Sequence, residues 1–108
     1  MERICKSSQF LYVRHHGIVV KTSHFWLQFC KNCDRTNKIG IIATKRIGNA
    51  VYRNRAKRII RELFRTHKTI FPEFVDIVVI PRKSIFTIAY QDLVNAFRDA
   101  IVKASNRL

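Results

Sequence analysis

A basic segment with helical periodicity, between Lys45 and Lys68, constrains this chain more than any other feature. The segment holds nine Lys and Arg residues and one acidic residue, so it carries a net charge of +8 in 24 residues, against +14 for all 108. At about 100° per residue, one side of a helix collects the apolar residues Ala56, Ile59, Ile60, Leu63 and Phe64. The other side collects Arg53, Asn54, Lys57, Arg58, Arg61 and Arg65. The pattern predicts a helix over about residues 50–66, capped by Asn49 and packed on a core by its apolar stripe.

The basic side of this helix indicates an anionic partner. A solvated helix face normally mixes Glu with Lys, whereas like charges four residues apart repel each other. Arginine predominates, and its guanidinium forks match phosphate oxygens. A chain with a pI near 10.6 needs a polyanion to offset its self-repulsion. Nucleic acid is the first candidate. An anionic membrane surface is the second, but it would need apolar residues that the core already requires.

The remaining pattern predicts a single α+β domain over residues 1–108. A short helix over about 7–16 ends at Gly17, and β-rich segments follow at 18–30 and 38–45, separated by a polar hairpin loop at 31–37. A nearly continuous apolar strand at 74–80 precedes a helix from about residue 88, with Thr87 as its possible cap. The predicted order is αβββαβα, arranged as a two-layer sandwich.

Composition limits where the chain works and what it binds. No apolar run approaches a membrane span and the N-terminus lacks a signal-peptide core, so we expect a cytoplasmic protein without a membrane partner. The three cysteines are expected to be thiols. Cys30 and Cys33 have a zinc-like spacing, but no second pair accompanies them, so we predict no metal site and treat Cys33 as a loop thiol.

The segment 45–65, KRIGNAVYRNRAKRIIRELFR, is specific enough to indicate a family. This segment closely resembles the signature of the bacterial ribonuclease P protein subunit. The parts that match are the basic pair at its start, the sequence Gly-Asn-Ala-Val, the triplet Arg53-Asn54-Arg55 and the later basic residues. The resemblance extends to the Ser-Ser-x-Phe helix before Gly17, the Asp-Ile-Val-Val-Ile strand followed by Pro-Arg, and the terminal amphipathic helix. It implies a ribosomal protein S5 domain 2-like fold, with an unusual left-handed βαβ crossover around the basic helix.

The resemblance also implies a function. Proteins of this family are cofactors of a catalytic RNA, and together they form an endoribonuclease that removes the 5′ leader of precursor tRNA and leaves a 5′ phosphate. Mg²⁺ ions held by RNA phosphates activate the attacking water. The protein therefore needs no catalytic residue, no bound cofactor and no protein partner. It binds the catalytic RNA and the single-stranded leader, and it broadens substrate specificity.

Two sets of site residues follow from the resemblance. Contacts to the catalytic RNA are expected from Lys45, Arg46, Asn49, Arg53, Asn54, Arg55, Lys57, Arg58, Arg61 and Arg65. A leader cleft is expected from Phe10, Arg14, Trp26, Gln28 and Thr44. Arg14 and Gln28 stand where relatives often have aromatics, and Ile42 replaces a small polar residue. Phe10 and Trp26 are each as typical of a core as of a base-stacking platform.

Other functions predict different features. A ribosomal protein would bind ribosomal RNA without affecting tRNA processing, and this is the main alternative. A DNA-reading helix would need a helix-turn-helix partner just upstream, where the pattern predicts a strand. An autonomous protein nuclease would stay active after removal of all RNA.

Overall fold

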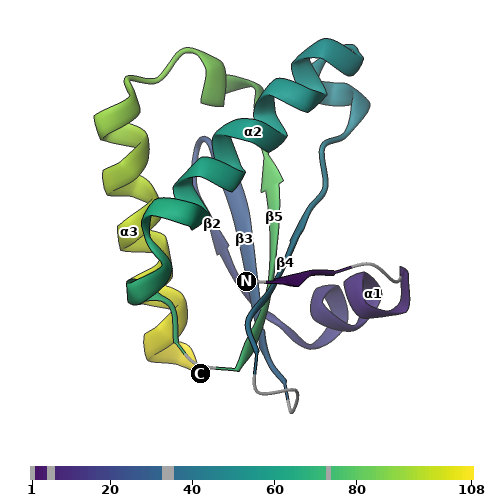
Figure 1. Cartoon of the computed structure of the whole chain (residues 1–108), viewed down its shortest axis with the longest axis vertical. Helices are drawn as coiled ribbons and strands as arrows, with labels where there is room; N and C mark the ends of the chain where they lie inside the picture. The colour runs from purple at the N-terminus through teal and green to yellow at the C-terminus, as the bar shows by residue number, and fades with distance from the viewer. Residues whose placement is uncertain (1, 5–6, 33–35, 73) are drawn as a thin grey trace.

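The computed structural model describes residues 2–4, 7–32, 36–72 and 74–108 (Figure 1). Its main elements are β1 (Glu2–Arg3), α1 (Ser7–His16), β2 (Ile18–Lys21), β3 (Phe25–Lys31), β4 (Lys38–Ile41), α2 (Ala50–Thr66), β5 (Val75–Pro81) and α3 (Tyr90–Arg107). Three short 3₁₀ turns join them: η1 (Lys45–Ile47), η2 (Lys68–Ile70) and η3 (Lys83–Phe86). The predicted α+β class and the order of the longer elements are confirmed. Cys33 lies outside the described residues.

The strands form one mixed sheet in the order β1-β4-β5-β3-β2. β4 runs parallel to β5 and to β1, whereas β3 is antiparallel to both β5 and β2. The sequence did not predict β1, which contributes only two residues at the edge of the sheet. Two residues are too few to show the alternation by which a strand is recognised, so pairing with β4 defines this one.

The connection from β4 through α2 to β5 is left-handed, as the resemblance implied. In Figure 1 both strands run upward, α2 lies in front of the sheet, and β5 lies to the left of β4. About 98% of parallel βαβ connections have the opposite hand. The crossover carries the basic helix diagonally over the sheet, and its exposed side faces away from the core.

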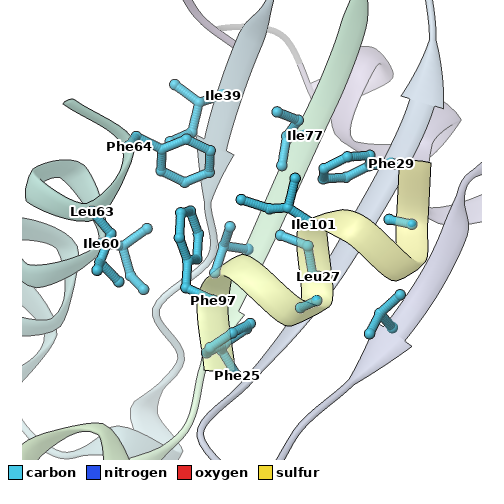
Figure 2. Packing of buried hydrophobic residues seen from close by; sticks show 14 of the residues in the cluster. Phe25, Leu27, Phe29, Ile39, Ile60, Leu63, Phe64, Ile77, Phe97 and Ile101 are labelled. Carbon is cyan, nitrogen blue, oxygen red and sulfur yellow. The ribbon is translucent and has the colours of Figure 1, made fainter. Parts of the chain in front are cut away.

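The main core lies between the sheet and the helices α2 and α3 (Figure 2). Ile60, Leu63 and Phe64 of α2 meet Phe97 and Ile101 of α3 over the strand residues Phe25, Leu27, Phe29 and Ile77. The stripe predicted for the basic helix is buried except for Ile59, which is half-buried. Burial of this stripe fixes the orientation of the basic side.

A smaller cluster lies on the opposite face of the sheet, under α1. Val13 of α1 packs there with Ile4, Cys30 and Val78. Side chains alternate between the faces of a strand, so Cys30 belongs to this cluster while its neighbour Phe29 belongs to the main core. α1 therefore adds a cover on the face that α2 and α3 leave open.

The predicted cap of the last helix was wrong. α3 begins after Ala89, which offers no side-chain cap, and the Thr87 hydroxyl instead donates to the Ser84 carbonyl at 3.1 Å. Thr87 directly follows the turn η3, so its hydroxyl bonds back to that turn and not forward to α3. No described helix combines the length and the apolar character of a membrane span.

Candidate nucleic-acid interface

The basic helix is oriented by the turn that begins it. Gly48 ends η1 with a φ of 140°, a conformation that residues with a side chain rarely adopt. Asn49 then caps α2, because its Oδ1 accepts from the backbone N–H groups of Val51 at 3.1 Å and Tyr52 at 3.3 Å. The predicted cap is confirmed, and the amide oxygen of Asn49 is thereby committed to the helix.

The outer side of α2 is a continuous cationic surface. We call it the basic face and define it by its exposed residues Asn54, Arg55, Arg58, Arg61 and Arg65. Lys45 and Arg46 of η1 are also exposed and extend the charge beyond the start of the helix. Lys57 is half-buried at the margin that faces β4. The tertiary structure therefore brings most of the predicted catalytic-RNA set onto one side of the molecule.

Arg53 departs from this arrangement. It is half-buried, and its Nη1 donates to the Gly48 carbonyl at 3.3 Å. The sequence placed Arg53 in the exposed fan, but its position turns toward the sheet and braces the turn before α2. Arg53 is thus a residue that supports the start of the basic face, and it is not part of the exposed surface.

Two further arginines on α2 have local partners. Arg65 Nε donates to Glu62 Oε2 at 3.0 Å, and this hydrogen bond lowers the pKa of the Glu62 carboxyl below its ordinary value. The Arg55 guanidinium lies 5.3 Å from the centre of the Phe86 ring. Glu62 partly offsets the charge of Arg65, whereas Arg58 and Arg61 make no ion pair within the described part of the chain.

A cleft of about 280 Å³ opens next to η1 on the face of the sheet that carries α1. We call it the tryptophan cleft. It is lined by Arg14, Trp26, Ile42, Thr44, Arg46, Ile47, Ile80, Pro81, Arg82 and Lys83. Trp26 of β3 pairs in register with Ile80 of β5, so the two side chains form an apolar floor. Four cations surround that floor, and no acidic residue lines the cleft among the residues that the structure describes.

Trp26 is half-buried, and cations lie over its ring. The Lys21 ammonium is 4.4 Å from the ring centre, and the Arg82 guanidinium is 5.6 Å from it. Such cation–aromatic contacts hold the positive groups beside an aromatic surface. A nucleotide in this cleft would find an aromatic ring and phosphate-binding groups together.

Sequence reasoning missed Arg82 and Lys83. They follow the buried strand β5, where the segment Pro81-Arg82-Lys83 showed only a strand end and two charges. Their spatial neighbours Trp26 and Arg46 come from distant parts of the chain. A basic pair directly after a central strand was the available signal, but the sheet order was needed to place it beside the tryptophan.

The predicted leader cleft is divided by the structure. Arg14, Trp26 and Thr44 come together in the tryptophan cleft. Phe10 instead lines a separate pocket at the edge of the sheet, with its ring packed against Gly40. Gln28 lines neither: it is only 6% exposed, and its buried Oε1 finds no hydrogen-bond partner in the described part of the chain.

A basic helix face beside a cationic cleft with an aromatic floor defines a protein of the nucleic-acid-binding class. Comparison with known proteins is more specific. The ribonuclease P family model matches residues 1–105, and the chain belongs to that family. The ribonuclease P protein component of Syntrophus aciditrophicus is 40% identical over 92 residues, which cover 85% of this chain and 77% of that one. The component from Thermotoga maritima is 37% identical over 84 residues, covering 78% and 72%.

Solved structures agree with this assignment. The Staphylococcus aureus RNase P protein superposes with a TM-score of 0.84 at 31% identity, covering 96% of this chain and 95% of that one. The Thermotoga maritima RNase P protein gives a TM-score of 0.79 at 29% identity, covering 100% and 98%. The fold predicted from the resemblance is confirmed. The family acts in tRNA processing, and membership implies the ribonuclease P RNA as a partner.

Proposed function

We propose that this chain binds the catalytic RNA of ribonuclease P through its basic face and holds the 5′ leader of precursor tRNA in the tryptophan cleft. The observation that carries the proposal is the contiguity of the two surfaces. Arg46 lines the cleft and belongs to η1, the turn directly before α2. The cleft that would hold the leader therefore lies next to the surface that would bind the catalytic RNA, so this chain would hold the two RNAs close together.

The chemistry of the cleft suits a single-stranded leader of variable sequence. Every base has a π-face, so contact with Trp26 does not depend on base identity. Arg14, Arg82 and Lys83 contact phosphates, which are also common to all sequences. The apolar floor of Trp26 and Ile80 excludes water from the stacked base. Single-stranded RNA meets these conditions better than a duplex, whose bases are already stacked.

In this proposal the RNA subunit carries the bond-breaking step. Mg²⁺ bound by RNA phosphates would supply the activation of the attacking water, and the products would be the free leader and a tRNA with a 5′ phosphate. The protein supplies cations that offset the repulsion between substrate and catalytic RNA. Because it binds the leader, it adds affinity that does not depend on the tRNA body, which broadens the range of substrates.

The first experiment is cleavage of precursor tRNA by a bacterial ribonuclease P RNA at low Mg²⁺, with and without this protein. We expect the protein to restore cleavage at the correct 5′ position and to be inert alone. Binding to RNA without stimulated cleavage would contradict the proposal and favour a structural RNA-binding role, such as that of a ribosomal protein. Cleavage by the protein alone would indicate an autonomous nuclease.

A matched pair of variants tests the cleft. Arg82→Ala removes a cation beside Trp26, whereas Arg98→Ala removes an exposed cation from α3. We expect Arg82→Ala to weaken holoenzyme binding of precursor tRNA more than binding of mature tRNA. Arg98→Ala should change neither. Equal losses for both tRNAs would place the Arg82 contact outside the leader.

A salt titration tests the basic face. We expect Arg58→Ala and Arg61→Ala each to weaken binding to the catalytic RNA and to reduce its salt slope by about 0.7 to 0.9 per lost phosphate contact. Arg53→Ala is a poor probe of this face, because Arg53 supports the turn at Gly48. An unchanged slope for the first two variants would contradict the proposed surface.

A further inference from the structure

The turn between β2 and β3 is bound to η3 next to the tryptophan cleft. The ladder between β3 and β5 continues by one bond, because the Arg82 N–H donates to the His24 carbonyl at 2.9 Å. Beyond that bond, the Ser84 hydroxyl donates to the Ser23 carbonyl at 2.8 Å, and Ser84 Oγ also lies 2.8 Å from His24 Nδ1. These hydrogen bonds form a junction between segments whose residues His24 and Ser84 are 60 positions apart in the chain.

Each of the two joined segments is ordered by contacts of its own. In the turn, Thr22 Oγ1 donates to the Phe25 carbonyl at 2.8 Å and accepts from the N–H groups of His24 at 3.2 Å and Phe25 at 3.1 Å. In η3, the Ile85 side chain is buried in the main core, and its N–H donates to the Arg82 carbonyl at 3.0 Å. The junction therefore determines how these two ordered segments are spaced.

The joined segments carry the two cations that lie over Trp26. Lys21 is the last residue of β2, directly before the turn, and its ammonium is 4.4 Å from the ring centre. Arg82 directly precedes η3, and its guanidinium is 5.6 Å from the same centre. Lys83, the first residue of η3, lines the cleft. The spacing across the junction thus controls where these cations stand relative to the aromatic ring.

The proton positions in the junction follow from its donors and acceptors. A hydroxyl has one proton, and the proton of Ser84 is directed at the Ser23 carbonyl, which can only accept. Ser84 Oγ is therefore the acceptor toward His24, so His24 Nδ1 carries a proton. A neutral imidazole has a single N–H, which leaves Nε2 of His24 unprotonated. The pair of side chains thus requires one defined tautomer of the histidine.

We propose that His24 and Ser84 are positioning residues for the tryptophan cleft: their hydrogen bond holds Arg82 and Lys83 beside Trp26, ready to contact the phosphates of the leader. The inference rests on the proposed leader binding and adds to it two residues that do not line the cleft themselves. Cations on a fixed backbone need less ordering when they bind phosphates, so more of the interaction energy remains for affinity.

NMR of the histidine ring nitrogens tests the geometry independently of RNA binding. At a pH where the rings are neutral, we expect wild-type His24 to be protonated at Nδ1, and we expect Ser84→Ala to release it to a mixture of the two tautomers. His67 is the internal reference: its Nδ1 lies 2.8 Å from the Leu63 carbonyl, which can only accept, so its tautomer should be the same in both proteins. Protonation of wild-type His24 at Nε2 alone would overturn the pair.

Holoenzyme binding tests the consequence for RNA. We expect Ser84→Ala to weaken binding of precursor tRNA by about two- to fivefold, the range of one exposed cation–aromatic contact, and to leave binding of mature tRNA unchanged. Ser84→Thr keeps the hydroxyl and should restore most of the affinity. Ser105→Ala is the matched control and should change neither, because it removes a hydroxyl that donates to a carbonyl at the same 2.8 Å but on α3. Unchanged precursor binding by Ser84→Ala, or equal losses for both tRNAs, would overturn the inference.

Coupling to Arg82 separates positioning from a general loss of stability. If Ser84 acts through the cations, Ser84→Ala should cost less precursor tRNA affinity in the Arg82→Ala background than in wild type. Additive losses would overturn the positioning role and leave the proposed function intact. Wild-type affinity of Arg82→Ala for precursor tRNA would instead remove the cleft from the proposed function, and this inference with it.

Variants of His24 make the same comparison from the other side of the hydrogen bond, and they keep the test valid if Ser84→Ala folds poorly. His24→Asn retains a side-chain N–H donor near the position of Nδ1, whereas His24→Leu has none. We expect only His24→Leu to reproduce the loss of precursor tRNA affinity. Equal affinities of the two variants would overturn the role of the hydrogen bond.

Discussion

Gly40→Ala is a direct test of where the Phe10 ring lies. A Cβ on Gly40 would be 2.3 Å from Cε1 of Phe10 and 2.7 Å from Cζ. Carbon atoms pack comfortably at about 3.5 to 4.0 Å, so the ring must move by about 1 Å or more. Overpacking of this kind costs about 1 to 3 kcal/mol in free energy of unfolding. Gly40 lies in β4, where alanine is otherwise slightly more favourable than glycine.

The assay is urea unfolding of four proteins: wild type, Gly40→Ala, Phe10→Leu and the double variant. Leucine lacks the two ring atoms that would clash, so Gly40→Ala should cost little or nothing in the Phe10→Leu background. The coupling between the two sites should therefore be about 1 to 3 kcal/mol. In thermal unfolding, a cost of 1 kcal/mol lowers Tm by about 4 to 8 °C for a domain near this size.

The same loss of stability for Gly40→Ala in both backgrounds would refute the reasoning. It would mean that the added methyl group meets something other than the Phe10 ring. Phe10 would then lie elsewhere, and the sheet-edge pocket would lose its apolar wall. A loss in wild type alone would establish that β4 needs a glycine because of this one aromatic side chain.

Three further predictions concern a helix cap, a buried thiol and an ion pair. Asn49→Ala should cost about 1 kcal/mol of stability by thermal unfolding, because the cap of α2 is lost, whereas Asn49→Asp should retain most of it; equal losses would show that the cap is unimportant. Burial, assisted by the nearby Asp76 carboxylate, raises the pKa of the Cys30 thiol above its ordinary value of 9.0. As pH rises, the unfolded chain therefore loses the thiol proton before the folded protein does, so the free energy of unfolding should fall above about pH 9. Urea midpoints measured at several pH values test this. The part of the fall that is due to the thiol should be absent in Cys30→Ala. Glu62→Gln removes the partner of Arg65 and should strengthen binding to the catalytic RNA and steepen its salt dependence, while Asp99→Asn on α3, with the same change in charge, should have a smaller effect in the same titration.

Local patterns in the sequence were sufficient for much of the fold. The helical spacing of Ile60, Leu63 and Phe64 predicted which side of α2 is buried, because a helix repeats every 3.6 residues regardless of its surroundings. The Gly48-Asn49 pair predicted the start of that helix, because Gly48 acts through its own backbone conformation and the Asn49 side chain reaches N–H groups only two and three residues further on. Thr87 shows the limit of such signals: a hydroxyl near a helix start can also bond within a preceding turn, and here it does.

The candidate site depended on contacts between distant segments. Phe10, Trp26 and Gln28 fell into one predicted cleft, but the structure gives them a sheet-edge pocket, an open cleft and a buried position, respectively. Whether a side chain is covered depends on where α1 lies across the strands, and no local pattern carries that information. Arg82 became a candidate RNA-binding residue only because β5, which it follows, lies between β3 and β4 and so brings it next to Trp26 of β3.

The sequence by itself determined the longer elements, the buried stripe of the basic helix, its cap and the strong positive charge. It also carried the family signature between Lys45 and Arg65, since these properties depend on residues close together in the chain. Only the tertiary structure decided that Arg53 braces a turn, that Arg46 joins the basic face to the tryptophan cleft, and that the edge of β4 opens between α1 and α2. The positions of Arg46 and of the β4 edge are set by strand order and by the left-handed crossover, whereas Arg53 bonds to a carbonyl only five residues away. Pairing and packing between distant residues determine the strand order and the crossover, and the periodicity of a single segment does not encode them.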